Sequence, residues 1–188
     1  MHRLNRTYSP ALKDQFYISI QNVIDSIPNT HAKLLIDDFN AECSTDSSIF
    51  PNVMGDFGYG KINDNSLRML SFASTNNFIL SDSWFRKKPR LRYTFFSNDG
   101  KTKKQLDHIL ISRRFRSMVE DVQVNYSADV LSDHRLVISK LRLHLKIQRS
   151  VKRKPKPNLS RLQTENGLHD SPLTIGLLLY QIFWKVMI

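Results

Sequence analysis

Three short clusters of polar residues have types and spacings that suit hydrolytic chemistry. The first is Asp38-Phe39-Asn40, which directly follows the apolar run Leu34-Leu35-Ile36. In extended backbone alternate side chains share a side, so Asp38 and Asn40 point together while Phe39 points into the core. A carboxylate beside an amide can hold and orient a water molecule. A plain polar turn is the alternative, because Asp and Asn are common turn formers.

The second cluster is Ser132-Asp133-His134, which lies just before the apolar segment that starts at Leu136. A carboxylate such as Asp133 is a ligand for a hard cation. An imidazole such as His134 can contact a phosphate or transfer a proton. An ordinary surface histidine at a loop–strand junction is the alternative interpretation.

The third cluster is Asp107-His108, within the apolar segment from Leu106 to Ile111. A carboxylate in such surroundings needs a partner, because an unpaired buried charge is costly. His134 is the predicted partner, since a carboxylate would fix the tautomer of its ring. A structural Asp–Arg salt bridge is the competing explanation.

The elements that must position these clusters alternate between helices and strands. Helical spacing of apolar residues predicts a helix over 13–27, ended by Pro28, and a second helix over 66–74. We expect strands at 33–36, 78–80, 122–126 and 136–145, a helical turn at 112–118, and a hairpin that joins 92–97 to 103–111 through Asp99-Gly100. This order predicts an α/β protein with its site at a strand end.

Composition limits the class of protein. The 188 residues suffice for one ordinary domain, and the single Cys43 excludes an internal disulfide and any multi-cysteine zinc site. We expect a domain over 1–146, a basic Pro-containing linker over 147–171 and an apolar segment over 172–188. That segment is short and interrupted by Gln181 and Lys185, so we do not expect it to span a membrane.

The charge pattern favours a nucleic-acid partner. The formal net charge is +11, and residues 134–164 carry ten Lys and Arg but no Asp or Glu. Within this stretch, residues 140–161 are typical of a non-specific nucleic-acid-binding segment or a nuclear signal, so we expect an intracellular, nuclear protein. Basic residues also surround the aromatic residues of the hairpin, which suits a nucleic-acid backbone, with a solvated charged face as the alternative. The predicted contacts are Arg90, Arg92, Lys101, Lys103 and Lys104.

Four longer stretches carry a family resemblance when they are taken together. They are LLIDDFNAE (34–42), NDNSLRMLSFASTNNFIL (63–80), RYTFFSNDGKTKKQLDHILISRRFR (92–116) and ADVLSDHRLVISKLRLHLK (128–146). Their order and separations resemble the endonuclease/exonuclease/phosphatase superfamily, which includes exonuclease III, apurinic endonucleases and DNase I. Within it, the chain is most similar to the endonuclease domains of non-LTR retrotransposons.

The resemblance implies the C-terminal part of a two-sheet α/β sandwich (DNase I-like), incomplete at its N-terminal side. It implies cleavage of DNA phosphodiesters with Mg²⁺ or Mn²⁺ and no small-molecule cofactor, with RNA as an alternative substrate. By matching motif, Asp38 would activate or orient the attacking water and Asn40 would stabilise that arrangement. Asp133 would lie at the metal. His134 would contact the scissile phosphate, with Asp107 hydrogen-bonded behind it.

The chain also departs from the family pattern. Asp37 stands where the family usually has Gly, which predicts backbone strain and an added charge beside Asp38. No residue from Met1 to Lys33 matches the family's early Asn or its metal-binding Glu, so we expect a truncated domain and weak metal binding. A catalytically inactive nucleic-acid-binding remnant and a lipid or inositol phosphatase are the alternative functions.

Overall fold

The computed structural model describes residue 4 and residues 7–97, 99–127 and 132–143. The predicted linker and apolar segment, 147–171 and 172–188, lie outside the described residues. No helix among the described residues is long and apolar enough to cross a membrane. The elements are α1 (Pro10–Ser26), β1 (Leu34–Asp38), α2 (Asp64–Thr75), β2 (Phe78–Leu80), β3 (Phe95–Phe96), β4 (Lys103–Lys104), β5 (Asp107–Ser112), β6 (Val119–Asn125) and β7 (Leu136–Leu141), with short 3-10 helices at Ser47–Ile49, Ser81–Trp84, Pro89–Leu91 and Arg113–Met118.

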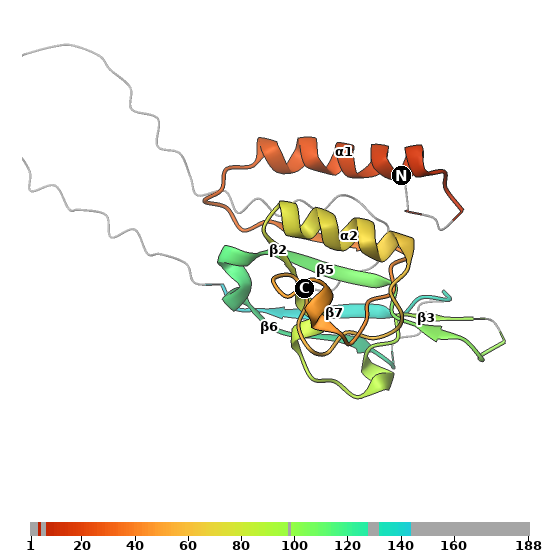
Figure 1. The fold of residues 1–188 in the computed structure, drawn as a ribbon. Helices are drawn as coiled ribbons and strands as arrows, with labels where there is room; N and C mark the ends of the chain where they lie inside the picture. The colour runs from red at the N-terminus through yellow and green to blue at the C-terminus, as the bar shows by residue number, and fades with distance from the viewer. Residues whose placement is uncertain (1–3, 5–6, 98, 128–131, 144–188) are drawn as a thin grey trace, which may run out of the picture.

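The described residues form three layers: helices α1 and α2, a central sheet, and the β6–β7 pair (Figure 1). The central sheet has the order β1-β5-β2, and both neighbours run antiparallel to β5. Leu35 opposes Leu110 and Asp38 opposes Asp107 in the β1–β5 register. The register therefore brings two of the predicted site residues to the same end of the sheet.

Alternation along the central strands builds two cores, one on each side of the sheet. Toward the helices point Leu35, Phe78, Leu80 and Leu110, which pack with Tyr17, Ile20, Met69 and Leu70. Toward β6 and β7 point Leu34, Ile36, Ile79, Ile109 and Ile111, which pack with Val119, Val122, Val137 and Leu141. Strands buried on both faces explain why β1, β2 and β5 are continuous apolar runs in the sequence.

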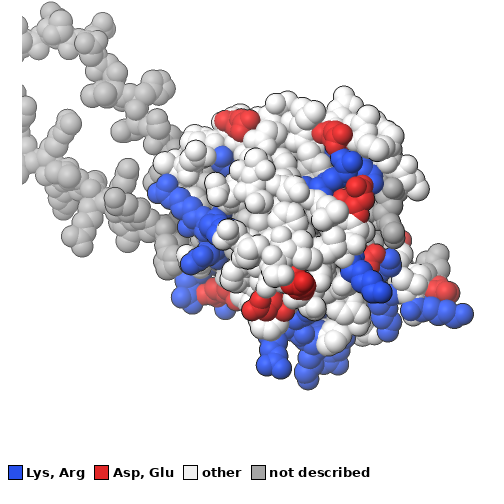
Figure 2. All heavy atoms as spheres, viewed as in Figure 1, with Lys and Arg blue, Asp and Glu red and all other residues white. Residues whose placement is uncertain are grey.

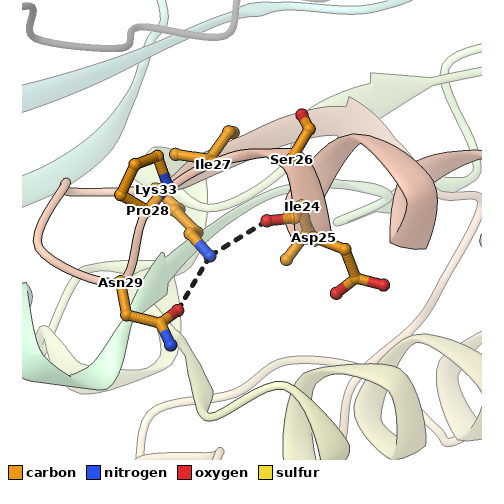
Figure 3. A pocket seen from close by; sticks show the side chains of 7 residues that line it. All are labelled: Ile24, Asp25, Ser26, Ile27, Pro28, Asn29 and Lys33. Carbon is orange, nitrogen blue, oxygen red and sulfur yellow. Dashed lines mark hydrogen bonds between the residues drawn. The ribbon is translucent and has the colours of Figure 1, made fainter.

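Both helices have local signals at their ends. The Ser9 side chain accepts a hydrogen bond from Leu12 N at the start of α1, and Pro10 occupies its first turn. Asn63 and Ser66 form a capping box at the start of α2. At the other end of α1, Lys33 donates to the Ile24 carbonyl at 3.0 Å and to Asn29 Oδ1 at 3.1 Å, across the pocket lined by residues 24–29 (Figure 3). This lysine therefore gives the Ile24 carbonyl a second donor, beside the backbone N–H of Ile27 at 3.2 Å.

The predicted hairpin is present, but its second strand is shorter than the sequence indicates. β3 pairs with β4 only over Phe95–Phe96 and Lys103–Lys104, with Gly100 at a φ of 69° in the turn. The prediction of one strand over 103–111 is wrong, because the chain breaks at Gln105-Leu106 and continues as β5 in the central sheet. At the break, Thr94 Oγ1 accepts hydrogen bonds from the backbone N–H groups of Leu106 and Asp107 at 2.9 and 3.1 Å. The Thr94 side chain therefore takes the place of the backbone acceptors that the facing strand of a continuous hairpin would supply.

Candidate active site

The imidazole of His134 lies between two carboxylates. His134 Nδ1 is 2.8 Å from Asp107 Oδ2, and His134 Nε2 is 3.7 Å from Asp38 Oδ2. The shorter distance is a hydrogen bond, whereas the longer one exceeds hydrogen-bond range. The Asp107–His134 pairing is the one expected from the sequence. The structure shows this pairing at Asp107 and not the competing Asp–Arg salt bridge.

Three separate parts of the chain bring these groups together. Asp38 ends β1, and Asp107 begins β5 directly opposite it. His134 follows the turn before β7 and pairs with Phe95 through an isolated antiparallel bridge. The rings of Phe95 and His134 are 5.4 Å apart in an edge-on arrangement, so the aromatic residue packs beside the imidazole. His134 and Asp38 are 1% and 2% exposed, which restricts their motion and limits water around them.

Asn40 lies beside Asp38 and also makes the turn that the alternative interpretation proposed. Its φ is 46°, in the left-handed region that Asn tolerates better than most residues. Its backbone N–H donates to Asp38 Oδ1 at 3.0 Å, and its Nδ2 lies 3.4 Å from Asp38 Oδ2 and donates to the Leu4 carbonyl at 2.8 Å. Phe39 is fully buried, as the alternation predicts. The turn thus orients the Asp38 carboxylate with two donors from one residue.

Two residues that sequence reasoning missed hold this turn in place. Asn63 Nδ2 donates to the Asn40 carbonyl at 3.1 Å, and Asn65 Nδ2 donates to the Phe39 carbonyl at 3.2 Å. Both residues lie at the start of α2, where the capping box fixes the backbone. The cap motif was readable in the sequence, but its contact with residues 39–40 depends on how α2 packs.

Asp37 does not strain the strand end. Its φ is not among the positive values, which occur in non-glycine residues only at Asn40 and Asn77 within the described residues. Its Oδ1 accepts a hydrogen bond from Asp38 N at 2.8 Å, and it is 8% exposed on the helix side of the sheet. The predicted strain is therefore wrong, because an extended strand accommodates any side chain at this position.

A second His–Asp pair, also missed from the sequence, lies on the helix side of β5. His108 Nδ1 is 2.9 Å from Asp82 Oδ2 and His108 Nε2 is 2.9 Å from the Ala41 carbonyl. Because both ring nitrogens face acceptors, both must carry a proton, so the ring is an imidazolium. Burial disfavours this charge, but the interactions with Asp82 and Cys43 together outweigh the burial and raise the pKa of His108 well above its usual value. This pair connects β5 to the loop that follows Asn40.

The donor set of the first cluster suits a divalent cation. Asp38, Asp107 and His134 offer ligand atoms that all lie within 4.8 Å of one another, and they form the one such group among the described residues. Carboxylate oxygens suit Mg²⁺ and Mn²⁺, and imidazole is accepted more readily by Mn²⁺. Asp133, predicted at the metal, is exposed beside His134 and is not a member of this group. Its role stays a prediction.

The predicted nucleic-acid contacts divide into two kinds. Arg90, Lys101 and Lys103 are exposed. Arg92 instead donates to the Phe57 and Gly58 carbonyls at 2.6 and 3.1 Å, and burial lowers its pKa. Lys104 forms an ion pair with Glu42 at 2.5 Å. Figure 2 shows Lys and Arg side chains along the lower part of the molecule and on the protruding β3–β4 hairpin, while most of the helical face is uncharged.

The chain is similar in sequence to two curated proteins. No family model matches the chain. It is 34% identical over 133 residues to craniofacial development protein 2 of Tragulus javanicus and of Bos taurus, which covers 71% of this chain but 23% and 22% of the relatives. The chain therefore spans about a quarter of the length of these curated relatives.

Solved structures share the fold. The chain superposes with a TM-score of 0.51 on a 3′-5′ exonuclease (NExo) of Neisseria meningitidis, with 20% sequence identity, over 72% of this chain and 56% of that one. A 3′ phosphatase NExo variant from Neisseria, bound to a product DNA hairpin, matches equally well. The expected fold, part of a DNase I-like α/β sandwich, is thus confirmed. The predicted resemblance is confirmed as well: the chain is similar in fold to an exonuclease and a phosphatase of this type and is similar in sequence to craniofacial development protein 2.

Proposed function

We propose that the chain is a metal-dependent phosphodiesterase that cleaves DNA, with Asp38, Asn40, Asp107 and His134 as its catalytic groups. The observation that supports this most is the position of His134, which is hydrogen-bonded to Asp107 and directed at Asp38. Similarity in fold to an exonuclease and to a DNA-bound phosphatase supports the same class of reaction. A retrotransposon origin, expected from the resemblance, is part of this proposal.

Each residue has a role in the proposed reaction that follows from its contacts. Asp107 accepts a hydrogen bond from His134 Nδ1, which fixes the tautomer and directs Nε2 toward the reacting phosphate. Asp38, held by two donors of Asn40, orients the attacking water and accepts its proton. With a proton also on Nε2, His134 donates to a phosphate oxygen and stabilises the charge that develops there. The bond from phosphorus to the leaving oxygen breaks as the water attacks, and the leaving oxygen takes a proton from solvent.

Because Asp107 and the His134 ring are hydrogen-bonded to each other, Asp38 is the member of this group that would hold a divalent cation, with Asp133 as the further predicted ligand. When bound, it supplies positive charge against the phosphate oxygens. Because few carboxylates converge here, we expect half-maximal cleavage only at millimolar Mg²⁺, with Mn²⁺ effective at lower concentration.

The test is nicking of supercoiled plasmid by the full chain with Mg²⁺ or Mn²⁺. We expect His134→Ala and Asp38→Asn to reduce the rate at least about 100-fold, because acid–base groups contribute about that much or more. His31→Gln is the matched control, since His31 lies in the loop between α1 and β1, outside the cluster. Equal residual nicking by the wild type and an Asp38→Ala/His134→Ala variant would exclude catalysis here.

The same preparation separates the alternative functions. Binding of plasmid without His134-dependent nicking would establish an inactive nucleic-acid-binding remnant. Release of phosphate from a phosphoinositide, without cleavage of DNA, would establish a lipid phosphatase. The expected nuclear location is tested by a fluorescent fusion with and without residues 140–161, and exclusion of the intact fusion from the nucleus would contradict it.

A further inference from the structure

A second group of side chains beside His134 has no role in the proposed reaction. The Arg135 guanidinium lies over the rings of Phe96 and Tyr126, with its central carbon 5.1 and 5.5 Å from their centroids. The two rings are themselves 6.5 Å apart in an edge-on arrangement. Lys103 Nζ lies 5.9 Å from the Phe96 centroid. We call these four residues the Arg135 platform.

The backbone fixes the distance between this platform and the catalytic cluster. Arg135 N donates to the Thr94 carbonyl at 2.6 Å, and Phe96 N donates to the Asp133 carbonyl at 2.8 Å. Residues that pair across such a ladder share a face, and the next pair faces the other way. Phe95 and His134 therefore share one face of this small sheet, while Phe96 and Arg135 share the other. The platform begins one residue from the catalytic imidazole.

The guanidinium is held in place but keeps its hydrogen-bonding capacity. Within the part of the chain that the structure describes, Arg92 donates to two carbonyls and Arg68 and Arg142 pair with carboxylates. Arg135 makes no such side-chain hydrogen bond or ion pair with a described residue. A guanidinium carries five N–H donors in one plane, which matches the oxygens of a phosphate.

The aromatic members of the Arg135 platform offer an exposed ring for stacking, which a site for phosphate alone does not need. Tyr126 is 55% exposed and is among the few large exposed apolar side chains of the described residues. An exposed ring beside cations suits stacking of an unpaired base, and this combination is typical of proteins that bind single strands. A lipid headgroup or a free phosphate would use the cations but not the ring.

We propose that the Arg135 platform binds an unpaired nucleotide of a nucleic-acid strand that enters the catalytic site. Arg135, with Lys103, contacts the backbone phosphate, and the base stacks on Tyr126. The link between the platform and the catalytic site rests on the proposed function. Binding at the platform does not itself require catalysis. The inference therefore names a substrate class: DNA with a single-stranded or frayed segment.

The test measures binding of a fluorescein-labelled 20-nucleotide single strand by anisotropy, with EDTA present and on a His134→Ala background, so that no cleavage occurs. We expect Arg135→Gln and Tyr126→Leu each to weaken binding about tenfold. Arg135→Gln also reduces the slope of log affinity against log salt by about one. Arg135→Lys keeps the charge but not the planar fork, so its affinity falls between those of the wild type and Arg135→Gln.

The matched control for loss of charge is Lys140→Gln, because Lys140 is an exposed cation on β7 that already pairs with Glu120. We expect it to change affinity less than twofold. A strand with an abasic residue in place of every base isolates stacking: the wild type binds it about tenfold more weakly, and Tyr126→Leu shows no further loss. Circular dichroism melting checks that each variant is folded.

The outcomes separate this inference from the proposed function. Equal weakening by Arg135→Gln and Lys140→Gln, or equal affinity for intact and abasic strands, would overturn the platform even if DNA is cleaved. Plasmid nicking that does not depend on His134, together with Arg135-dependent and base-dependent binding, would overturn the proposed function and support the platform. We expect the wild type and Tyr126→Leu to bind a fully paired duplex with equal affinity, since paired bases cannot stack on the ring.

Discussion

Two His–Asp pairs lie on opposite sides of β5, at consecutive residues of one strand. On the side of β6 and β7, Asp107 pairs with His134. On the helix side, His108 pairs with Asp82. Both pairs are short, at 2.8 and 2.9 Å, and both histidines are nearly inaccessible. Pair geometry and burial alone therefore do not distinguish a catalytic pair from a structural one.

The two pairs differ in the group that the second ring nitrogen of the histidine faces. His108 Nε2 contacts the Ala41 carbonyl at 2.9 Å, so the ring joins the Asp82 side chain to the backbone at Ala41, and both of its nitrogens have structural partners. His134 Nε2 instead faces the Asp38 carboxylate at 3.7 Å, too far for a hydrogen bond. Under the proposed function, the partner of the second ring nitrogen separates the pair that stabilises the fold from the pair that serves the reaction.

The largest expected effect on stability comes from removing Asp82. Asp82→Ala leaves the buried His108 imidazolium without its counter-ion and also removes the acceptor for Gln105 Nε2 and Ile109 N. We expect the free energy of unfolding to fall by about 3–5 kcal/mol, as for other broken buried ion pairs. Urea denaturation measures it, and a loss under about 1 kcal/mol would contradict a structural role.

The opposite outcome is expected for Asp107. Asp107→Asn removes the charge behind His134 and should reduce plasmid nicking about 100-fold or more, because the imidazole loses its fixed tautomer. Unfolding in urea should shift by no more than about 1 kcal/mol, since the side chain is 18% exposed and an amide still fits. A variant that loses stability but nicks at the wild-type rate per folded molecule would reverse the assignment of the two pairs.

A substitution at Cys43 tests the structural His108–Asp82 pair, with a smaller expected effect on stability. Its Sγ lies 3.9 Å from His108 Nε2, and the residue is 1% exposed. We expect Cys43→Ala to lower the free energy of unfolding by about 1 kcal/mol through lost packing. Because Cys43 touches His108 and not His134, nicking by the folded protein should stay unchanged. A tenfold loss of nicking at equal folded fraction would show that the two sides of β5 are coupled.

The smallest effect is expected at Asp37, which neighbours Asp38 but lies on the helix side. Asp37→Gly restores the residue usual in the family and removes one acceptor of Asp38 N. We expect a loss of about 0.5–1 kcal/mol of stability, because glycine weakens a strand. The nicking rate should change less than about threefold, a shift below 1 kcal/mol in the barrier. A tenfold increase would show that the Asp37 charge restrains Asp38.

Prediction from sequence succeeded where the signal is local. Apolar runs with flanking turn residues located β1 and β2, and helical spacing located both helices to within a few residues. It failed at Lys103–Ile111, where a hydrogen-bond network centred on Thr94 redirects the chain into another sheet. It also gave no sign that Arg92 and Lys104 have partners more than thirty positions away. Nothing in a local pattern records such partners.

The sequence by itself determined the elements, the apolar faces of the central strands and the identity of the reactive groups, since periodicity and motif are local properties. The Asp107–His134 pair was expected from the sequence, whereas the tertiary structure alone decided that His108 joins Asp82. His108 and His134 both have an aspartate within hydrogen-bond reach, at 26 and 27 positions along the chain. Only the alternation of β5, with one residue facing the helices and the next facing the second sheet, assigns one pair to the fold and leaves the other beside Asp38.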